Sequence, residues 1–227
     1  MRHFEQQLQD LLQKLTVMGS TAESMIDLAV RSLLQRSEAL AEEVFAREAE
    51  VNRLQVQIDQ DTVTLTATHQ PVARDVRFLF GASRAVTDIE RIADQAKNIC
   101  QNARFVHVGP PLKPIVDLPL MADTARTMVH DAITALVRRD CALAEKVLAE
   151  EHKVDAFRDQ VFRTLLTYMM ADPGTIQRAL SLILISRNLE RIGDHASNIA
   201  EEVIYMVQGR DVRHATSEPK EETSAGT

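Results

Sequence analysis

Apolar positions recur at helical spacing along most of this chain. A first amphipathic run extends from Phe4 to Arg36, and Ser37 is placed to cap the run that follows. In that second run apolar residues return every seven positions, at Val44, Val51, Ile58 and Leu65, with Leu54 between them. A period of three and a half residues sustained over several turns is typical of the seam of a helical bundle. The pattern therefore predicts an all-α chain.

The same pattern continues after a break near the middle of the chain. A third run extends from Pro71, which fits a first helical turn, to about Arg104. Four of the seven prolines then crowd together, at Pro110, Pro111, Pro114 and Pro119. Because proline lacks the N–H group and clashes with the preceding turn of a helix, this stretch is predicted to be a linker.

Three further helices are predicted beyond the linker. The first covers Leu120 to Arg139, Asp140 is a candidate cap for the next, and Asp172-Pro173 opens a last helix that ends near Gly209. The last helix carries a regular seam at Ile185, Leu189, Ile192, Ala196, Ile199, Val203 and Met206. The residues from about His214 onward are polar and poor in apolar side chains, which predicts disorder.

The two halves also match in sequence. The segment from Ile89 to Ile99 (IERIADQAKNI) and the segment from Leu189 to Ile199 (LERIGDHASNI) agree at seven of eleven positions. A weaker match, 103 residues apart, joins the segments that begin at Val44 and Val147. We infer an internal duplication of a three-helix unit, and hence two tandem three-helix bundles. The predicted division is residues 1–106, a proline-rich linker at 107–119, residues 120–213, and a disordered tail at 214–227.

Composition narrows the function classes. With 33 acidic and 26 basic side chains the net charge is −7, which disfavours a broad nucleic-acid-binding face. The two cysteines, Cys100 and Cys141, form no metal-binding or disulfide pattern, and each is expected to lie in a helix as a small apolar residue. No signal peptide or membrane span is recognisable, so we expect a cytoplasmic protein that reaches membranes only through partners.

Paired carboxylates four residues apart occur at equivalent places in both halves. They are Glu90 with Asp94 and Glu190 with Asp194, together with Glu151 and Asp155 and their first-half counterparts Glu48 and Asn52. Residues four apart share one face of a helix, where two like charges destabilise it by about 0.2–0.5 kcal/mol. A hard cation turns that repulsion into coordination, because oxygen ligands suit magnesium, manganese and oxidised iron.

The helical positions of these carboxylates point to the outside of the bundle. At 100° per residue, Glu190 lies about 140° and Asp194 about 180° from the middle of the apolar stripe, and the same holds for Glu90 and Asp94. We therefore hypothesise surface metal sites, each completed by the pair on a neighbouring helix. The alternative is a solvated charged face without any ligand.

The other polar residues carry weaker signals. No histidine follows a glutamate at the Glu-x-x-His spacing of di-iron bundles. His195 adjoins Asp194 and could join a metal site, although a solvent-facing position is favoured, and no partner is evident for His130. The recurring Asn98 and Asn198 are expected to hydrogen-bond between helices. No nucleophile with a base and no phosphate-binding glycine loop is present, so an enzyme is not expected.

At the repeated ERIGD-type segment the chain resembles the PhoU family of bacterial phosphate-signalling regulators. The likeness extends from about residue 4 to 209 and includes Met18-Gly19, the segment 70–77 (QPVARDVR) and the segment 188–202 (NLERIGDHASNIAEE). Two departures are Ala93, where the family's first motif usually has glycine, and Asn52 in place of a carboxylate. A metal site in the first half is therefore expected to be the weaker one.

The resemblance implies a function. Proteins of this family have a six-helix architecture, are commonly homodimers, and act as cytoplasmic negative regulators of the phosphate-starvation response. They are thought to bridge the ATPase subunit of the phosphate ABC transporter and the sensor histidine kinase of the phosphate two-component system. Some members carry iron, zinc, manganese or magnesium on their acidic motifs.

Three readings follow from the sequence. The leading one is an adaptor without catalytic chemistry, which acts through differential affinity for two states of a kinase complex. The second is a metal-binding helical bundle with a storage or redox role. The third is a purely structural dimer module whose acidic pairs are only a solvated face.

Overall fold

The protein is described by a computed structural model that places residues 2–112 and 117–212. The helices are α1 (Arg2–Gln35), α2 (Glu38–His69), α3 (Ala73–Val106), α4 (Asp117–Arg138), α5 (Cys141–Ala171) and α6 (Ile176–Gln208), and a short 3-10 helix, η1 (Pro173–Thr175), precedes α6. The described ranges hold no strand. The predicted all-α class is confirmed.

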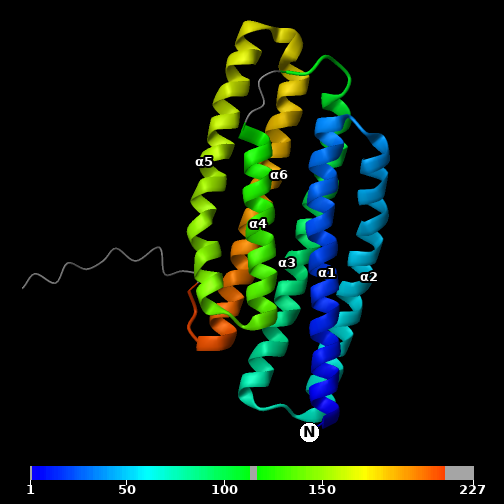
Figure 1. Cartoon of the computed structure of the whole chain (residues 1–227), viewed down its shortest axis with the longest axis vertical. Coiled ribbons are helices and arrows are strands. Elements are labelled where there is room, and N and C mark those ends of the chain that lie inside the picture. Colours follow the sequence, from blue (N-terminus) through cyan, green and yellow to red (C-terminus); the bar gives the residue numbers. More distant parts are fainter. Residues whose placement is uncertain (1, 113–116, 213–227) are drawn as a thin grey trace, which may run out of the picture.

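Two three-helix bundles lie side by side (Figure 1). The most extensive helix–helix contact of the described chain, between α3 and α6, joins them. Helices α1, α2 and α3 pack together, as do α4, α5 and α6, while α3 packs extensively on α6 and α1 packs on α4. Helices α2 and α5 occupy the outer flanks of the molecule (Figure 1). The buried apolar side chains of both bundles form one continuous cluster. The predicted tandem bundles are confirmed, and they are fused through a shared core.

The predicted seams are the buried faces of the helices. All the predicted seam positions are buried, namely Val44, Val51, Leu54, Ile58 and Leu65 of α2 and Ile185, Leu189, Ile192, Ala196, Ile199, Val203 and Met206 of α6. The predicted caps are also present, since the side chain of Ser37 accepts a hydrogen bond from Leu40 N at 3.4 Å and that of Asp140 accepts one from Leu143 N at 3.1 Å. A cap of this type typically stabilises a helix by about 1 kcal/mol.

Helix boundaries next to prolines differ from the prediction. Helix α3 begins two residues after Pro71, with Val72 as an extended N-cap residue. Helix α4 begins at Asp117, so that Pro119 lies in its first turn, where a missing N–H group leaves no hydrogen bond unmade. The exact domain limits stay a prediction. Residues 113–116 of the linker and the tail 214–227 fall outside the described ranges.

Three unusual positions, Gly19, Arg36 and Arg139, make close contacts with distant parts of the chain. Helix α1 runs unbroken through Gly19, where a Cβ atom would lie 2.6 Å from Cδ1 of Ile133 on α4. Arg36 and Arg139 end α1 and α4 at equivalent positions with left-handed φ of 55° and 56°. The Arg36 guanidinium donates to the carbonyl of Gly109 at 2.7 Å, and that of Arg139 lies 4.4 Å from the ring centroid of Phe78. Both side chains thus tie one part of the chain to another.

The remaining expectations concern cysteines and membranes. Cys100 is buried in α3, and burial raises the pKa of its thiol to about 12, which is the behaviour of a small apolar residue. Cys141 is the first residue of α5 and is partly buried. None of the described helices is both long and apolar enough to span a membrane.

Candidate functional site

The predicted carboxylates gather in two clusters at equivalent places in the two bundles. The first acidic cluster (Glu48, Asn52, Glu90 and Asp94) lies on α2 and α3, and the second acidic cluster (Glu151, Asp155, Glu190 and Asp194) lies on α5 and α6. None of the eight side chains belongs to the buried core; Asn52 and Asp194 are exposed and the other six are half-buried. The predicted position at the surface of the bundle agrees with this burial.

Carboxylates crowd one another in each cluster. Partial burial raises the pKa of Glu90, and the charges of Asp94 and Glu48 raise it further. The pKa of Asp194 is also raised, first because neighbouring atoms displace part of the water around its carboxylate. The charges of Glu190, Glu151 and Asp155 raise this pKa further. In both cases carboxylates of two helices contribute to the raised pKa. Such a site favours a bound proton or cation.

Asn52 stands apart from the first cluster. It lies one turn beyond Glu48 on α2, and in the described part of the chain no hydrogen bond joins its side chain to the other three residues. The first cluster therefore contains three carboxylates that affect one another electrostatically, whereas the second contains four.

Each cluster contains a cation from the protein itself. Lys97 on α3 donates from Nζ to Oε1 of Glu48 at 2.5 Å. Arg158 on α5 bonds to Glu190 across the helix interface and lies 3.4 Å from Asp155. Sequence reasoning missed both residues, although Lys97 follows Asp94 by three positions and Arg158 follows Asp155 by three, a spacing that brings side chains together on a helix.

The ion pairs of Lys97 and Arg158 occupy carboxylates that a metal ion would need as ligands. In residues 2–112 and 117–212 no three His, Cys, Asp or Glu side chains converge closely enough to hold a metal ion. The donor set consists of carboxylate oxygens, which fits a hard cation. In the ion-paired arrangement, however, Lys97 and Arg158 supply the positive charge, and a metal would have to replace them.

A second polar site joins the two bundles between α3 and α6. Nδ1 of His195 lies 2.9 Å from Oδ1 of Asp88, and Asn198 donates to the same oxygen at 3.1 Å. Arg84 pairs with the buried Glu202 at 3.1 Å beside them. Arg84, Asp88, Asn198 and Glu202 line a groove of about 310 Å³ along the junction of the two bundles.

This second site corrects one expectation and supports another. His195 was expected to face solvent, but its side chain is only 14% exposed and is bonded to Asp88 in the other half of the chain. The expected interhelical hydrogen bond is confirmed for Asn198. His130, for which the sequence indicated no partner, lies 3.1 Å from Glu23 of α1. The contacts of His195 and His130 both join the two repeats.

Comparison with known proteins identifies the family. The PhoU domain matches the chain twice, at residues 15–103 and 118–203, one match in each bundle. The chain belongs to the PhoU family. Its two domain matches cover the helices that carry both acidic clusters.

Relatives of the PhoU family match along nearly the whole chain. The phosphate-specific transport system accessory protein PhoU homolog of Pseudomonas putida is 38% identical over 94% of this chain and 84% of its own length. The accessory protein PhoU of Escherichia coli (strain K12) is 32% identical over 98% of this chain and 92% of its own. The relatives are thus named as accessory proteins of a phosphate transport system.

Solved structures show the same fold. The crystal structure of PhoU from Pseudomonas aeruginosa, 36% identical, superposes with a TM-score of 0.87 and covers 91% of this chain and 100% of its own. The regulatory protein PhoU from Streptococcus pneumoniae has a TM-score of 0.85 at 21% identity, which shows the shared fold alone. The fused six-helix architecture is therefore that of the PhoU family.

Proposed function

We propose that this protein is a cytoplasmic negative regulator of the phosphate-starvation response and of phosphate uptake. The observation that carries the proposal is the doubled PhoU domain, with relatives named as accessory proteins of the phosphate-specific transport system over almost the whole chain. In this proposal the protein forms a homodimer. It acts as an adaptor between the ATPase subunit of the phosphate ABC transporter and the sensor histidine kinase. It acts by binding the inhibited state of the kinase complex more tightly than the active state.

Deletion of the gene tests the regulatory role. We expect the phosphate-starvation genes to stay switched on in phosphate-rich medium, because the bound partner that stabilises the inhibited kinase is lost. A transcriptional reporter of a starvation gene measures this, in a strain that carries no second PhoU-domain gene, with a plasmid-borne copy as the control. Normal repression in the deletion strain would contradict the adaptor role, and disturbed metal content with normal repression would favour the storage or redox reading.

We further propose that the second acidic cluster binds a divalent or trivalent metal ion such as iron, zinc, manganese or magnesium. Its four carboxylates would supply the oxygen ligands, and the first acidic cluster would bind the same ion more weakly because Asn52 replaces a carboxylate. The support is the crowding that raises the pKa of Glu90 and Asp194.

Removal of two ligands tests the metal site. The double variant Glu190→Ala/Asp194→Ala should lose most of the metal that wild-type protein retains after purification without chelator, because half of the donor set is gone. Inductively coupled plasma mass spectrometry measures the content. The matched control is Glu145→Ala/Glu150→Ala, two acidic residues of α5 outside the cluster, which should leave the metal content unchanged. Equal metal in both variants would exclude the cluster as the site.

A further inference from the structure

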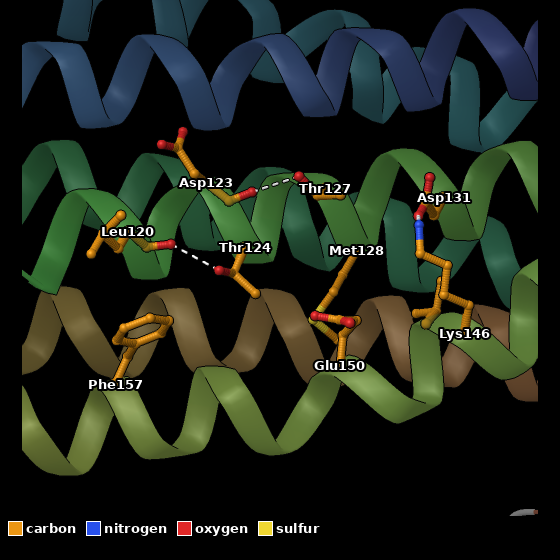
Figure 2. A pocket seen from close by; sticks show the side chains of 10 residues that line it. Leu120, Asp123, Thr124, Thr127, Met128, Asp131, Lys146, Glu150 and Phe157 are labelled. Carbon is orange, nitrogen blue, oxygen red and sulfur yellow. Dashed lines mark hydrogen bonds and ion pairs between the residues drawn. The ribbon is translucent and has the colours of Figure 1, made fainter.

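The function proposed so far does not involve a groove on the surface of the second bundle. It lies between α4 and α5 and has a volume of about 340 Å³ (Figure 2). No residue of either acidic cluster lines it. Its apolar lining comes from Leu120, Met128, Val147 and Phe157. Leu120 is 51% exposed, although most large apolar side chains of α4 are buried. Leu120 and the partly buried Phe157 therefore place apolar surface in the groove.

The internal repeat shows what fills the same place in the first bundle. At an offset of 103 residues, Met18, Ala22 and Met25 of α1 align with Met121, Ala125 and Met128 of α4, and all six are buried. With this offset Glu150 stands where the first bundle has Arg47, and Thr127 stands where it has Ser24.

In the first bundle an arginine closes the helix interface. Arg47 reaches from α2 to α1 and donates to Oγ of Ser24 at 2.6 Å and to Glu43 at 2.6 Å. In the second bundle Glu150 cannot make these bonds. The hydroxyl of Thr127 donates instead to the carbonyl of Asp123 at 2.8 Å, which leaves its oxygen free to accept, as Ser24 does from Arg47.

The polar rim of the groove is acidic. Asp123, Asp131 and Glu150 contribute three carboxylates, and Lys146, which donates to Asp131 at 2.8 Å, contributes the only ammonium group of the lining (Figure 2). Glu150 is otherwise paired with Lys153, three residues along the same helix and 52% exposed. Exposed pairs of this kind are worth about 0.2–1 kcal/mol, so an incoming cation can displace the lysine.

We propose that this groove is the docking site for an amphipathic helix of a partner protein, in which an arginine takes the place that Arg47 occupies in the first bundle. Apolar side chains of the partner, at helical spacing, cover Leu120 and Phe157. The partner's guanidinium donates to Glu150 and to the hydroxyl of Thr127. Helix-in-groove binding with an arginine as one anchor is a common mode of recognition between proteins.

A synthetic helix tests the docking site with the full-length protein. The probe is a fluorescein-labelled amphipathic peptide with leucines at helical spacing along one side and arginines next to them, and its binding is followed by fluorescence anisotropy. Glu150→Arg should weaken binding about tenfold or more, since an internal arginine then fills the place of the partner's. This variant should fold normally because the first bundle already accommodates an arginine there.

Matched variants separate the groove from a general effect. Leu120→Ser should weaken the peptide about three- to tenfold, whereas Val17→Ser, at the equivalent and 41% exposed position of the first bundle, should leave binding unchanged. A second peptide with glutamates in place of the arginines should bind more weakly than the first. Equal binding of the first peptide to wild-type protein and to Glu150→Arg would overturn the proposal. A homodimer that Glu150→Arg dissociates, seen by light scattering, would overturn it as well, because the groove would then belong to a second copy.

Discussion

Replacement of Phe78 by alanine should lower the free energy of unfolding by about 3–5 kcal/mol, the usual cost of removing a large aromatic side chain from a packed core. Phe78 is only 1% exposed and lies near the start of α3. The guanidinium of Arg139, the residue that follows α4, lies over the Phe78 ring. The Phe78 side chain therefore contacts both bundles. The loss should therefore reach both bundles and not the first alone.

Chemical denaturation followed by circular dichroism measures this effect. The matched control is Phe80→Ala, two residues along the same helix, where the ring is 56% exposed and the change should be within about 0.5 kcal/mol. Both variants should unfold in one transition, as expected when one core serves two bundles. Two separate transitions for Phe78→Ala would show that the bundles unfold independently.

The helices were predictable because the sequence features that specify them, apolar spacing and capping residues, lie close together in sequence and recur along the chain. A seam such as Val44, Val51 and Ile58 has to face the core at every second turn, and the caps Ser37 and Asp140 satisfy backbone N–H groups close to them in sequence. Proline marked the helix starts only to within two or three residues, because it is compatible both with a first turn, as at Pro119, and with the extended segment before one.

Contacts between the bundles were not predictable from spacing. Asp88 and His195 are 107 residues apart, and so are Glu23 and His130. Each pair exists because α3 packs on α6 and α1 packs on α4, and the periodicity within one helix contains no record of that packing. His195 therefore looked like a solvent-facing residue, although its side chain is largely buried against the other half of the chain.

The acidic clusters fall between these two cases. The duplication was sufficient to predict that Glu190 and Asp194 share one face beside the pair on the neighbouring helix. Partial loss of hydration raises the pKa of Asp194, and the charges of Glu190, Glu151 and Asp155 raise it further. The sequence also contained Arg158, at helical spacing from Asp155, but carboxylates considered alone indicated a metal and not an ion pair. The contact between Arg158 and Glu190 needs both helices in place.

Replacement of Arg158 by glutamine should increase the affinity of the second acidic cluster for a divalent cation by about tenfold. Arg158 is the positive charge that bonds to Glu190 and lies beside Asp155, so a metal that binds there has to compete with it. Without metal the same variant leaves four carboxylates without that cation. We expect its free energy of unfolding to fall by about 1–2 kcal/mol, the contribution of a hydrogen bond to a charged, half-buried group.

Calorimetric titration with manganese measures the affinity, and thermal unfolding with and without manganese measures the stability. The control is Lys153→Gln, which removes an exposed cation of the same helix that pairs with Glu150 outside the cluster, and which should change neither quantity by more than a small factor. Manganese should restore the stability of Arg158→Gln and not that of the double variant Glu190→Ala/Asp194→Ala. An affinity that is the same with and without Arg158 would mean that metal and arginine do not compete, and the cluster would then be an ion-paired surface that holds α5 on α6.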